Sequence, residues 1–289
     1  MDHGTNPHGG WWSHRGEPET PGRRGHRCWL SRCSQSEGGI VNRLENRVAV
    51  ITGGATGIGG AAAELCAAEG AIVHLLDANA EDGRATEARI RDHGGVARFH
   101  EVDVRDAEQL RATFERIRTT DEQIHVLVCS AGVLRGAYCG IDDLDEEDWD
   151  ATLDTNLKGT YLTTRFAAPG LRKADKSVIL LISSGAGVRG GSSSYAYAAS
   201  KAGVHGLQYN LQSDLGATGS RIHVVCPGGI ATPLKLKNVA EGAASRGENV
   251  EAAVAGARES LGDPVGVARV LTFLASDDGD YVRGTIFTR

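Results

Sequence analysis

Tyr197 and Lys201 begin and end the segment Tyr-Ala-Ala-Ser-Lys, which has a helix-forming composition. Residues four positions apart lie on one face of a helix, so these two side chains are expected to be adjacent. A tyrosine hydroxyl titrates near pH ~10, and a neighbouring ammonium lowers its pKa by stabilising the phenolate. The pair is therefore predicted to move a proton, with Tyr197 as the proton-transfer residue. The alternative is a surface tyrosine beside a solvated lysine.

Two more polar residues are expected near this pair. Ser184 closes an apolar run before Tyr197, at a predicted strand end, where its hydroxyl could hydrogen-bond a substrate oxygen. Asn156 lies inside a predicted long helix, where asparagine is mildly unfavourable. Anchoring a water near Lys201 would explain it, and a solvent-exposed asparagine is the alternative.

A glycine-rich loop, Thr52–Gly59, follows the β-branched run 48–51 and precedes an Ala-rich helix. Glycines in this strand–loop–helix context let the backbone approach a pyrophosphate, which the free N–H groups of the helix then bind. The alternative is that these glycines serve packing only. The predicted dinucleotide contacts in the loop are Gly53, Thr56, Gly57, Ile58 and Gly59.

Asp77 ends the second apolar run and is expected to determine whether NAD or NADP binds. A carboxylate there can accept hydrogen bonds from the adenosine ribose hydroxyls, and it would repel a 2′-phosphate. Neither Thr56 nor residues 78–80 supply a cation. NAD is therefore predicted over NADP, although Asp77 could instead be a helix N-cap.

The elements that must position these residues alternate along the chain, which is typical of parallel βαβ units. The predicted fold is α/β, a single doubly wound Rossmann-type domain with a parallel sheet of about seven strands. Residues 233–262 are predicted to form short helices that act as a lid. The predicted strands span 48–51, 71–76, 97–102, 125–129, 177–182, 222–226 and 284–288, and the predicted helices span 61–68, 81–93, 107–119, 146–168, 195–216 and 264–275.

Together these motifs resemble those of the short-chain dehydrogenase/reductase family, over roughly residues 44–289. The resemblance rests also on Asp103 after the third strand and on Pro-Gly-Gly-Ile-Ala-Thr at 227–232. It implies hydride transfer between NAD(H) and a secondary alcohol or ketone, in a homodimer or homotetramer. It further implies that Ser184 polarises the carbonyl, Tyr197 transfers the proton, Lys201 binds the nicotinamide ribose and Asn156 holds a relay water. The remaining implied cofactor contacts are Asp103, Val104, Ser130, Gly132, Pro227, Gly228, Ile230 and Thr232.

The sequence departs from the family pattern at two places. Ser130 stands where the family has an asparagine, so cofactor positioning is expected to differ slightly. The family's Asp-Gly-Gly after the last strand is not found, which puts a pocket wall and subunit contacts in question. Two rival functions stay open: an NADPH-dependent 3-oxoacyl carrier-protein reductase and a non-enzymatic NAD-binding regulator. Val133, Gly185, Ala186, Tyr195 and the segment 233–262 are expected to line the substrate pocket.

Composition narrows the class of protein. The chain has 289 residues, a formal net charge of −6 and six cysteines. It has no long basic run, no CxxC pair and no apolar run near the ~20 residues of a membrane helix. No nucleic-acid or membrane partner and no metal are expected, and free thiols favour the cytoplasm.

Residues 1–43 differ in composition from the rest, being rich in Gly, Arg, His, Ser and Trp without a helical or strand period. They have no apolar core of a secretory signal. They are predicted to be a disordered or non-native extension, and the NAD-binding domain is predicted to span residues 44–289. Cys28 and Cys33, close to His26, match no zinc-finger spacing.

Overall fold

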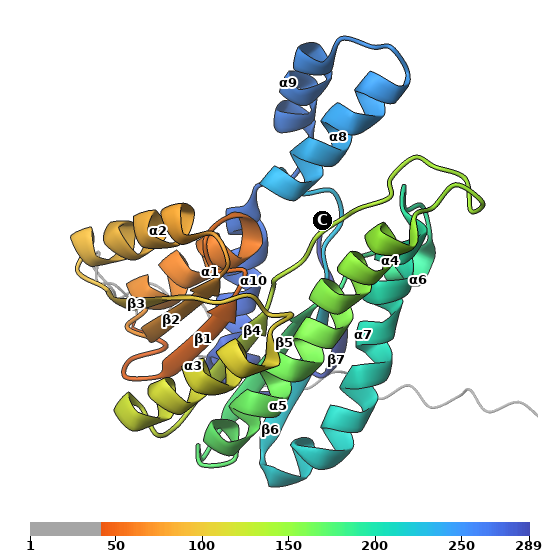
Figure 1. Cartoon of the computed structure of the whole chain (residues 1–289). Helices are drawn as coiled ribbons and strands as arrows, with labels where there is room; N and C mark the ends of the chain where they lie inside the picture. The colour runs from red at the N-terminus through yellow and green to blue at the C-terminus, as the bar shows by residue number, and fades with distance from the viewer. Residues whose placement is uncertain (1–41) are drawn as a thin grey trace, which may run out of the picture. The chain divides into compact units, whose positions relative to one another are not determined.

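The computed structural model describes residues 42–289, drawn in colour in Figure 1. The predicted extension thus lies outside the described residues apart from its last two positions, and so do Cys28 and Cys33. The domain boundary near residue 44 stays a prediction.

A seven-stranded sheet lies at the centre of the described part (Figure 1), and every pairing in it is parallel. The order is β3-β2-β1-β4-β5-β6-β7. Chain order therefore runs outward in both directions from the boundary between β1 and β4, and this doubly wound arrangement confirms the predicted fold class. The strands are β1 (Val48–Thr52), β2 (Ile72–Asp77), β3 (Val96–Glu101), β4 (Val126–Cys129), β5 (Ser177–Ile182), β6 (Ser220–Cys226) and β7 (Gly284–Phe287).

Helices cover both faces of the sheet because the central strands are apolar on both sides. In β1, Ala49 and Ile51 belong to one core cluster, whereas Val50 between them belongs to the other. The first cluster includes residues of α1 (Gly57–Ala68), α2 (Ala80–Asp92) and α10 (Pro264–Ala275). The second includes residues of α3 (Ala107–Thr120), α5 (Gly159–Leu171) and α7 (Tyr195–Asp214).

Two helices differ from their predicted bounds by more than two residues. α1 begins at Gly57 rather than at residue 61, because the last glycines of the loop already form its first turn. The long helix predicted over 146–168 consists of α4 (Glu146–Leu153), a π-helical turn over Asp154–Lys158, and α5. Asn156 lies inside that π turn, and such turns are frequent at functional sites.

The segment after β6 forms short helices, as predicted. α8 (Pro233–Ser245) and α9 (Val250–Ser260) pack against each other and stand clear of the two helix layers in Figure 1. The first turns of α8 reach the pocket described below, whereas no residue of α9 lines it. The segment therefore forms one wall of the pocket.

Candidate active site

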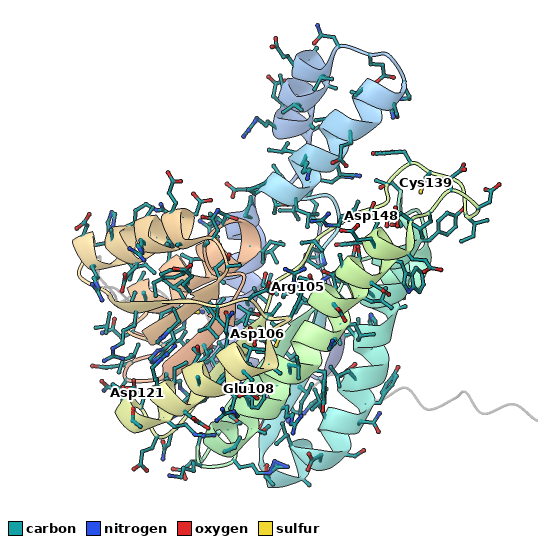
Figure 2. All side chains as sticks on the ribbon, viewed as in Figure 1. Arg105, Asp106, Glu108, Asp121, Cys139 and Asp148 are labelled. Carbon is teal, nitrogen blue, oxygen red and sulfur yellow. The ribbon has the colours of Figure 1, made fainter. Side chains whose placement is uncertain are left out.

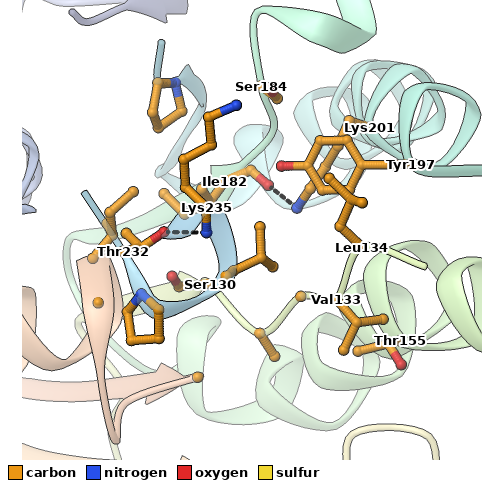
Figure 3. A pocket seen from close by; sticks show the side chains of 18 of the residues that line it. Ser130, Val133, Leu134, Thr155, Ile182, Ser184, Tyr197, Lys201, Thr232 and Lys235 are labelled. Atoms are coloured by element: carbon orange, nitrogen blue, oxygen red, sulfur yellow. Dashed lines mark hydrogen bonds between the residues drawn. The ribbon is translucent and has the colours of Figure 1, made fainter. Parts of the chain in front are cut away.

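A pocket of about 650 Å³ lies at the carboxyl edge of the sheet, where β1, β4, β5 and β6 end. Ligands of doubly wound sheets bind at this edge, near the point where the strand order reverses. Figure 3 shows its interior. Of the residues predicted from the sequence, the lining includes Gly53, Thr56, Gly57, Ile58, Asp77, Asp103, Val104, Ser130, Gly132, Ser184, Tyr197, Lys201, Pro227, Gly228, Ile230 and Thr232.

Helix α7 brings Tyr197 and Lys201 to the pocket. Its start is fixed by Ser194, whose side chain accepts a hydrogen bond from the Tyr197 N–H at 3.2 Å. Lys201, one turn later, is only 4% exposed, and its Nζ donates a 2.9 Å hydrogen bond to the carbonyl of Ile182 (Figure 3). The ammonium lies 5.7 Å from the centre of the Tyr197 ring. The four-residue spacing on α7 and the hydrogen bond to the end of β5 thus hold the Tyr197 and Lys201 side chains next to each other at the pocket.

Burial dominates the protonation of this pair. It raises the pKa of Tyr197, and the neighbouring Ser184 hydroxyl opposes that shift. It lowers the pKa of Lys201 to about 8, because an ammonium is costly to desolvate. The sequence predicted a lowered pKa for Tyr197, and this prediction is wrong because burial outweighs the neighbouring groups and raises the pKa. The raised pKa means that the Tyr197 hydroxyl keeps its proton at neutral pH.

Asn156 is completely buried, which removes the alternative of a solvent-exposed asparagine. Its Oδ1 accepts from the Val133 N–H at 2.8 Å, and its Nδ2 donates to the Val133 carbonyl at 2.9 Å and to Ser200 Oγ at 3.0 Å. It therefore lies behind the pocket lining and fixes the loop that follows β4.

Gly132 keeps a space open between Asn156 and Lys201. A Cβ at this position would lie 3.3 Å from Asn156 Oδ1 and 3.5 Å from Lys201 Nζ. An oxygen acceptor and an ammonium thus face the same small volume, which a glycine leaves free. This geometry could hold a water between the two polar atoms.

The glycine loop presents an uncapped helix start to the pocket. Thr56 is the N-cap of α1 but makes no side-chain capping bond, and no acidic residue stands in the first turn. The other long helices that begin after a loop, α2, α3, α4, α7, α8, α9 and α10, all have a side-chain cap. The free N–H groups and positive dipole end of α1 suit an anion such as a pyrophosphate.

Two glycines of the loop act through close packing. A Cβ at Gly59 would lie 2.1 Å from the carbonyl oxygen of Gly53, so this residue lets α1 approach the loop and does not itself line the pocket. Gly53 has φ +66°, and a Cβ there would lie 2.7 Å from the Ala131 nitrogen. Both are needed to join the loop to the end of β4.

Asp77 is oriented by the backbone around it. Its Oδ2 accepts from the Ala55 N–H at 3.1 Å and its Oδ1 from the Asn79 N–H at 2.9 Å. Each oxygen keeps a lone pair for a further donor. Asn79, and not Asp77, caps α2. The N-cap alternative for Asp77 is therefore wrong.

At the next strand end, Asp103 pairs with Arg105, a pocket-lining cation that the sequence interpretation had not singled out. Arg105 Nη2 lies 2.6 Å from Asp103 Oδ2, and this guanidinium lowers the pKa of the carboxyl. Figure 2 places Arg105 beside Asp106, the residue that caps α3.

The segment after β6 closes the pocket. Pro227 accepts a 3.2 Å hydrogen bond from the Gly185 N–H, and Gly228 donates one of 3.0 Å to Arg289. Thr232 caps α8, its hydroxyl accepting from the Lys235 N–H at 3.2 Å (Figure 3). Ile230 forms an isolated bridge with Gly262, which ties the two ends of the α8–α9 segment together.

The substrate end of the lining includes Val133, Gly185 and Ala186 as expected, whereas Tyr195 does not line the pocket. Tyr195 is the first residue of α7 and is 48% exposed, and the preceding Ser192 and Ser193 line the pocket instead. Lys235 and Asn238 belong to the segment 233–262 that was also expected at the pocket, whereas the sequence interpretation had not singled out Arg135.

Residues 42–289 hold no group of three or more His, Cys, Asp or Glu side chains that could bind a metal ion. In the same residues, no helix is long and apolar enough to cross a membrane. Cys66, Cys129 and Cys226 are buried free thiols, and Cys139 is partly exposed.

Comparison with known proteins agrees with this geometry. A family model described as short chain dehydrogenase matches residues 47–242. The 3-oxoacyl-(acyl-carrier-protein) reductase FabG of Thermotoga maritima is 35% identical over 247 residues, covering 84% of this chain and 96% of the relative. A cyclopentanol dehydrogenase of Comamonas testosteroni is 32% identical over 253 residues, covering 85% and 96%. The solved structure of a levodione reductase superposes with a TM-score of 0.78 at 28% identity, covering 84% and 96%. The chain is an oxidoreductase and belongs to the short-chain dehydrogenase family.

Proposed function

We propose that this protein transfers a hydride between NAD(H) and a secondary alcohol or ketone, with Tyr197 as the proton-transfer residue. The observation that carries the proposal is the placement of Tyr197, Ser184 and Lys201 in the lining of one pocket, which the glycine loop also enters. The nicotinamide ring would accept the hydride from an alcohol or give it to a ketone.

The residues present fit such a dinucleotide. The uncapped start of α1 would hold the pyrophosphate, and Asp77 would accept hydrogen bonds from the adenosine ribose. Lys201 would donate to the nicotinamide ribose, with its ammonium already held by Ile182. The other lining residues from the sequence pattern, such as Asp103, Ser130 and Ile230, would complete the contacts.

The chain's own part in the reaction is orientation and proton movement. Ser184 would hydrogen-bond the substrate oxygen, and Tyr197 would donate its proton to that oxygen during reduction or accept one during oxidation. The space beside Gly132 would hold a water between Lys201 and Asn156, through which the proton reaches solvent.

NAD is proposed over NADP because Asp77 lines the pocket and, among residues 42–289, the arginines that follow it on α2 are paired elsewhere. Arg84 and Arg89, the two arginines of α2 that could have reached back, pair with Glu101 at 3.8 Å and Glu64 at 2.9 Å instead. Neither of them lines the pocket. The remaining nearby cation, Arg105, is engaged by Asp103.

A 3-oxoacyl carrier-protein reductase is the second candidate, because a relative with that name is 35% identical to this chain. A non-enzymatic regulator is disfavoured by the complete set of Ser184, Tyr197 and Lys201 at the pocket. We further propose a homodimer or homotetramer, from the family resemblance, and a cytoplasmic location, from the buried free thiols.

The experiment is to measure NAD and NADP reduction by the purified protein over a panel of secondary alcohols, with the matching ketones in reverse. Turnover of at least one alcohol, faster with NAD, is expected. Turnover of 3-oxoacyl thioesters alone, with NADPH, would support the second candidate. Binding of the dinucleotide without any turnover would favour the regulator.

A further inference from the structure

The charges that line the pocket are unevenly distributed. The only carboxylates in the described lining are Asp77 and Asp103, both at ends of strands on the glycine-loop side of the sheet. Of the cations there, Arg105 pairs with Asp103 and Lys201 donates to Ile182. Two further cations, Arg135 and Lys235, are left without a proposed role.

Lys235 lies in the first turn of α8 and is only partly exposed. Figure 3 shows its side chain extending among the other pocket-lining side chains. Within residues 42–289 it forms no ion pair, whereas Lys237, two positions later, lies 3.8 Å from Glu241 and does not line the pocket. A partly buried ammonium without a counter-charge is a binding element for an anion.

Hydrogen bonds hold the backbone of Arg135 and the α8 turn that follows Lys235 beside the start of α7, the helix that carries Tyr197. Ser194 Oγ donates to the carbonyl of Arg135 at 2.6 Å. Its neighbour Ser193 accepts a 3.0 Å hydrogen bond from Asn238 Nδ2, one turn after Lys235 on α8. Arg135 and the Lys235 turn thus border the same dipeptide, at the substrate end of the pocket.

This arrangement is held firmly by Tyr138. Its hydroxyl lies 3.1 Å from the Asn238 carbonyl, and its N–H donates to the Ser193 carbonyl at 2.8 Å. Its φ of +62° is unusual for a residue with a side chain, and its ring packs where a Cβ of Gly242 would lie 2.6 Å away. The loop, the dipeptide and α8 are therefore fixed to one another before a substrate arrives.

Arg135 is only loosely neutralised. Its Nη1 lies 3.7 Å from Asp148 Oδ1, beyond hydrogen-bonding distance, and Asp148 Oδ2 accepts instead from the Gly136 N–H at 3.1 Å. Figure 2 places Asp148 on α4, below the loop that carries Cys139. The guanidinium thus keeps free N–H donors at the rim of the pocket.

We infer that the substrate carries an anionic group, a carboxylate or a phosphate, which Lys235 binds with help from Arg135 while its alcohol or ketone carbon faces Tyr197. This inference rests on the proposed function, since it names the substrate class of the same site. The pyrophosphate of the cofactor is the other anion that Lys235 could bind, so substrate binding and cofactor binding are measured separately.

The test compares matched pairs of secondary alcohols: 3-hydroxybutyrate with its methyl ester, and glycerol 3-phosphate with 3-methoxypropane-1,2-diol. The wild type is expected to favour the anionic member of at least one pair by about tenfold or more in kcat/KM, as a charge-assisted hydrogen bond implies. Lys235→Met should abolish most of that preference through KM, and Lys235→Arg should retain it. The two pairs also distinguish a carboxylate from a phosphate.

Lys237→Met is the matched control, because it removes the same charge from the same helix outside the pocket lining. It should keep the preference. NADH binding to each variant, followed by fluorescence, should not change. A tenfold weaker binding of NADH to Lys235→Met would assign Lys235 to the cofactor and overturn the inference.

Preference for the neutral members, or turnover confined to neutral alcohols of the wider panel, would also overturn it while leaving the proposed function intact. Loss of all turnover over the whole panel, with NADH still bound, would instead contradict the proposed function.

Discussion

Lys201 donates its 2.9 Å hydrogen bond to the carbonyl oxygen of Ile182, the last residue of β5. A helix and a strand end are thereby joined through a buried ammonium, which is 4% exposed. Because β5 ends at the edge where the pocket opens, this bond holds the positive charge of Lys201 beside Tyr197. The partner is a backbone carbonyl, so no carboxylate of residues 42–289 neutralises the ammonium. This hydrogen bond uses one of the three N–H donors of the ammonium and leaves the other two for further acceptors.

The Tyr197→Phe variant is expected to lose at least about 100-fold in kcat while binding NADH with nearly unchanged affinity. The phenylalanine keeps the ring and removes only the hydroxyl, and positioned proton transfer is worth roughly 10²- to 10⁴-fold. Steady-state rates check the loss of kcat, and fluorescence titration with NADH checks the unchanged affinity. A variant that retains more than about a tenth of the wild-type rate would exclude Tyr197 as the proton-transfer residue.

A methyl group at Gly132 is expected to disturb the space between Asn156 and Lys201. Gly132→Ala would place its Cβ 3.3 Å from Asn156 Oδ1, so kcat should fall by about tenfold or more while the substrate KM changes little. Gly206→Ala is the control, because a Cβ at that position of α7 meets no atom within 4 Å. Equal activity of the two variants would contradict a role for this space.

Cofactor choice can be tested by charge reversal at the end of β2. The wild type is expected to use NAD better than NADP by roughly 10- to 150-fold in kcat/KM, about 1.4–3 kcal/mol, since Asp77 would bind the ribose and repel a 2′-phosphate. Asp77→Ser combined with Ala78→Arg should narrow or reverse this ratio. Equal or better use of NADP by the wild type would remove Asp77 from this role and favour the second candidate function.

Stability is expected to fall in mild acid because of a histidine pair on the neighbouring strands β2 and β3. His74 Nδ1 lies 2.9 Å from His100 Nε2, and His74 Nε2 lies 3.1 Å from Asp121, which Arg98 also binds. Burial, helped by His74, Arg116 and Arg98, lowers the pKa of His100 to about 4 from an ordinary 6.5. The folded protein thus binds fewer protons than the unfolded chain, and the stabilisation present above pH 6.5 is lost as the pH falls toward 4.

Denaturant unfolding at pH 7 and pH 5 measures this effect. The wild type should lose on the order of 1–2 kcal/mol, less than the pKa difference alone implies because part of the ring is solvated. His100→Asn should flatten the dependence, whereas His93→Asn on the exposed end of α2 should leave it unchanged. A wild type equally stable at both pH values would disprove the coupling.

The sequence by itself determined the fold class and the family motifs. Alternating apolar runs and helical segments predicted a parallel doubly wound sheet, because βαβ units permit few other arrangements. The four-residue spacing of Tyr197 and Lys201, and the glycine loop before α1, likewise depend on local geometry that a sequence displays directly. All seven expected strands are present, and no strand end differs from its predicted position by more than two residues.

Only the tertiary structure decided the surroundings of these residues. The raised pKa of Tyr197 and the lowered pKa of Lys201 come from burial, which no motif reports. The π turn around Asn156 and its bonds to Val133 and Ser200 depend on packing between α4, α5 and α7. Lys235 meets the pocket because Tyr138 and Asn238 hold α8 against two distant loops. Tyr138 and Asn238 are 100 positions apart in the chain, and Asn238 and Ser193 are 45 apart. Their pairing follows from how the whole chain packs rather than from local preference.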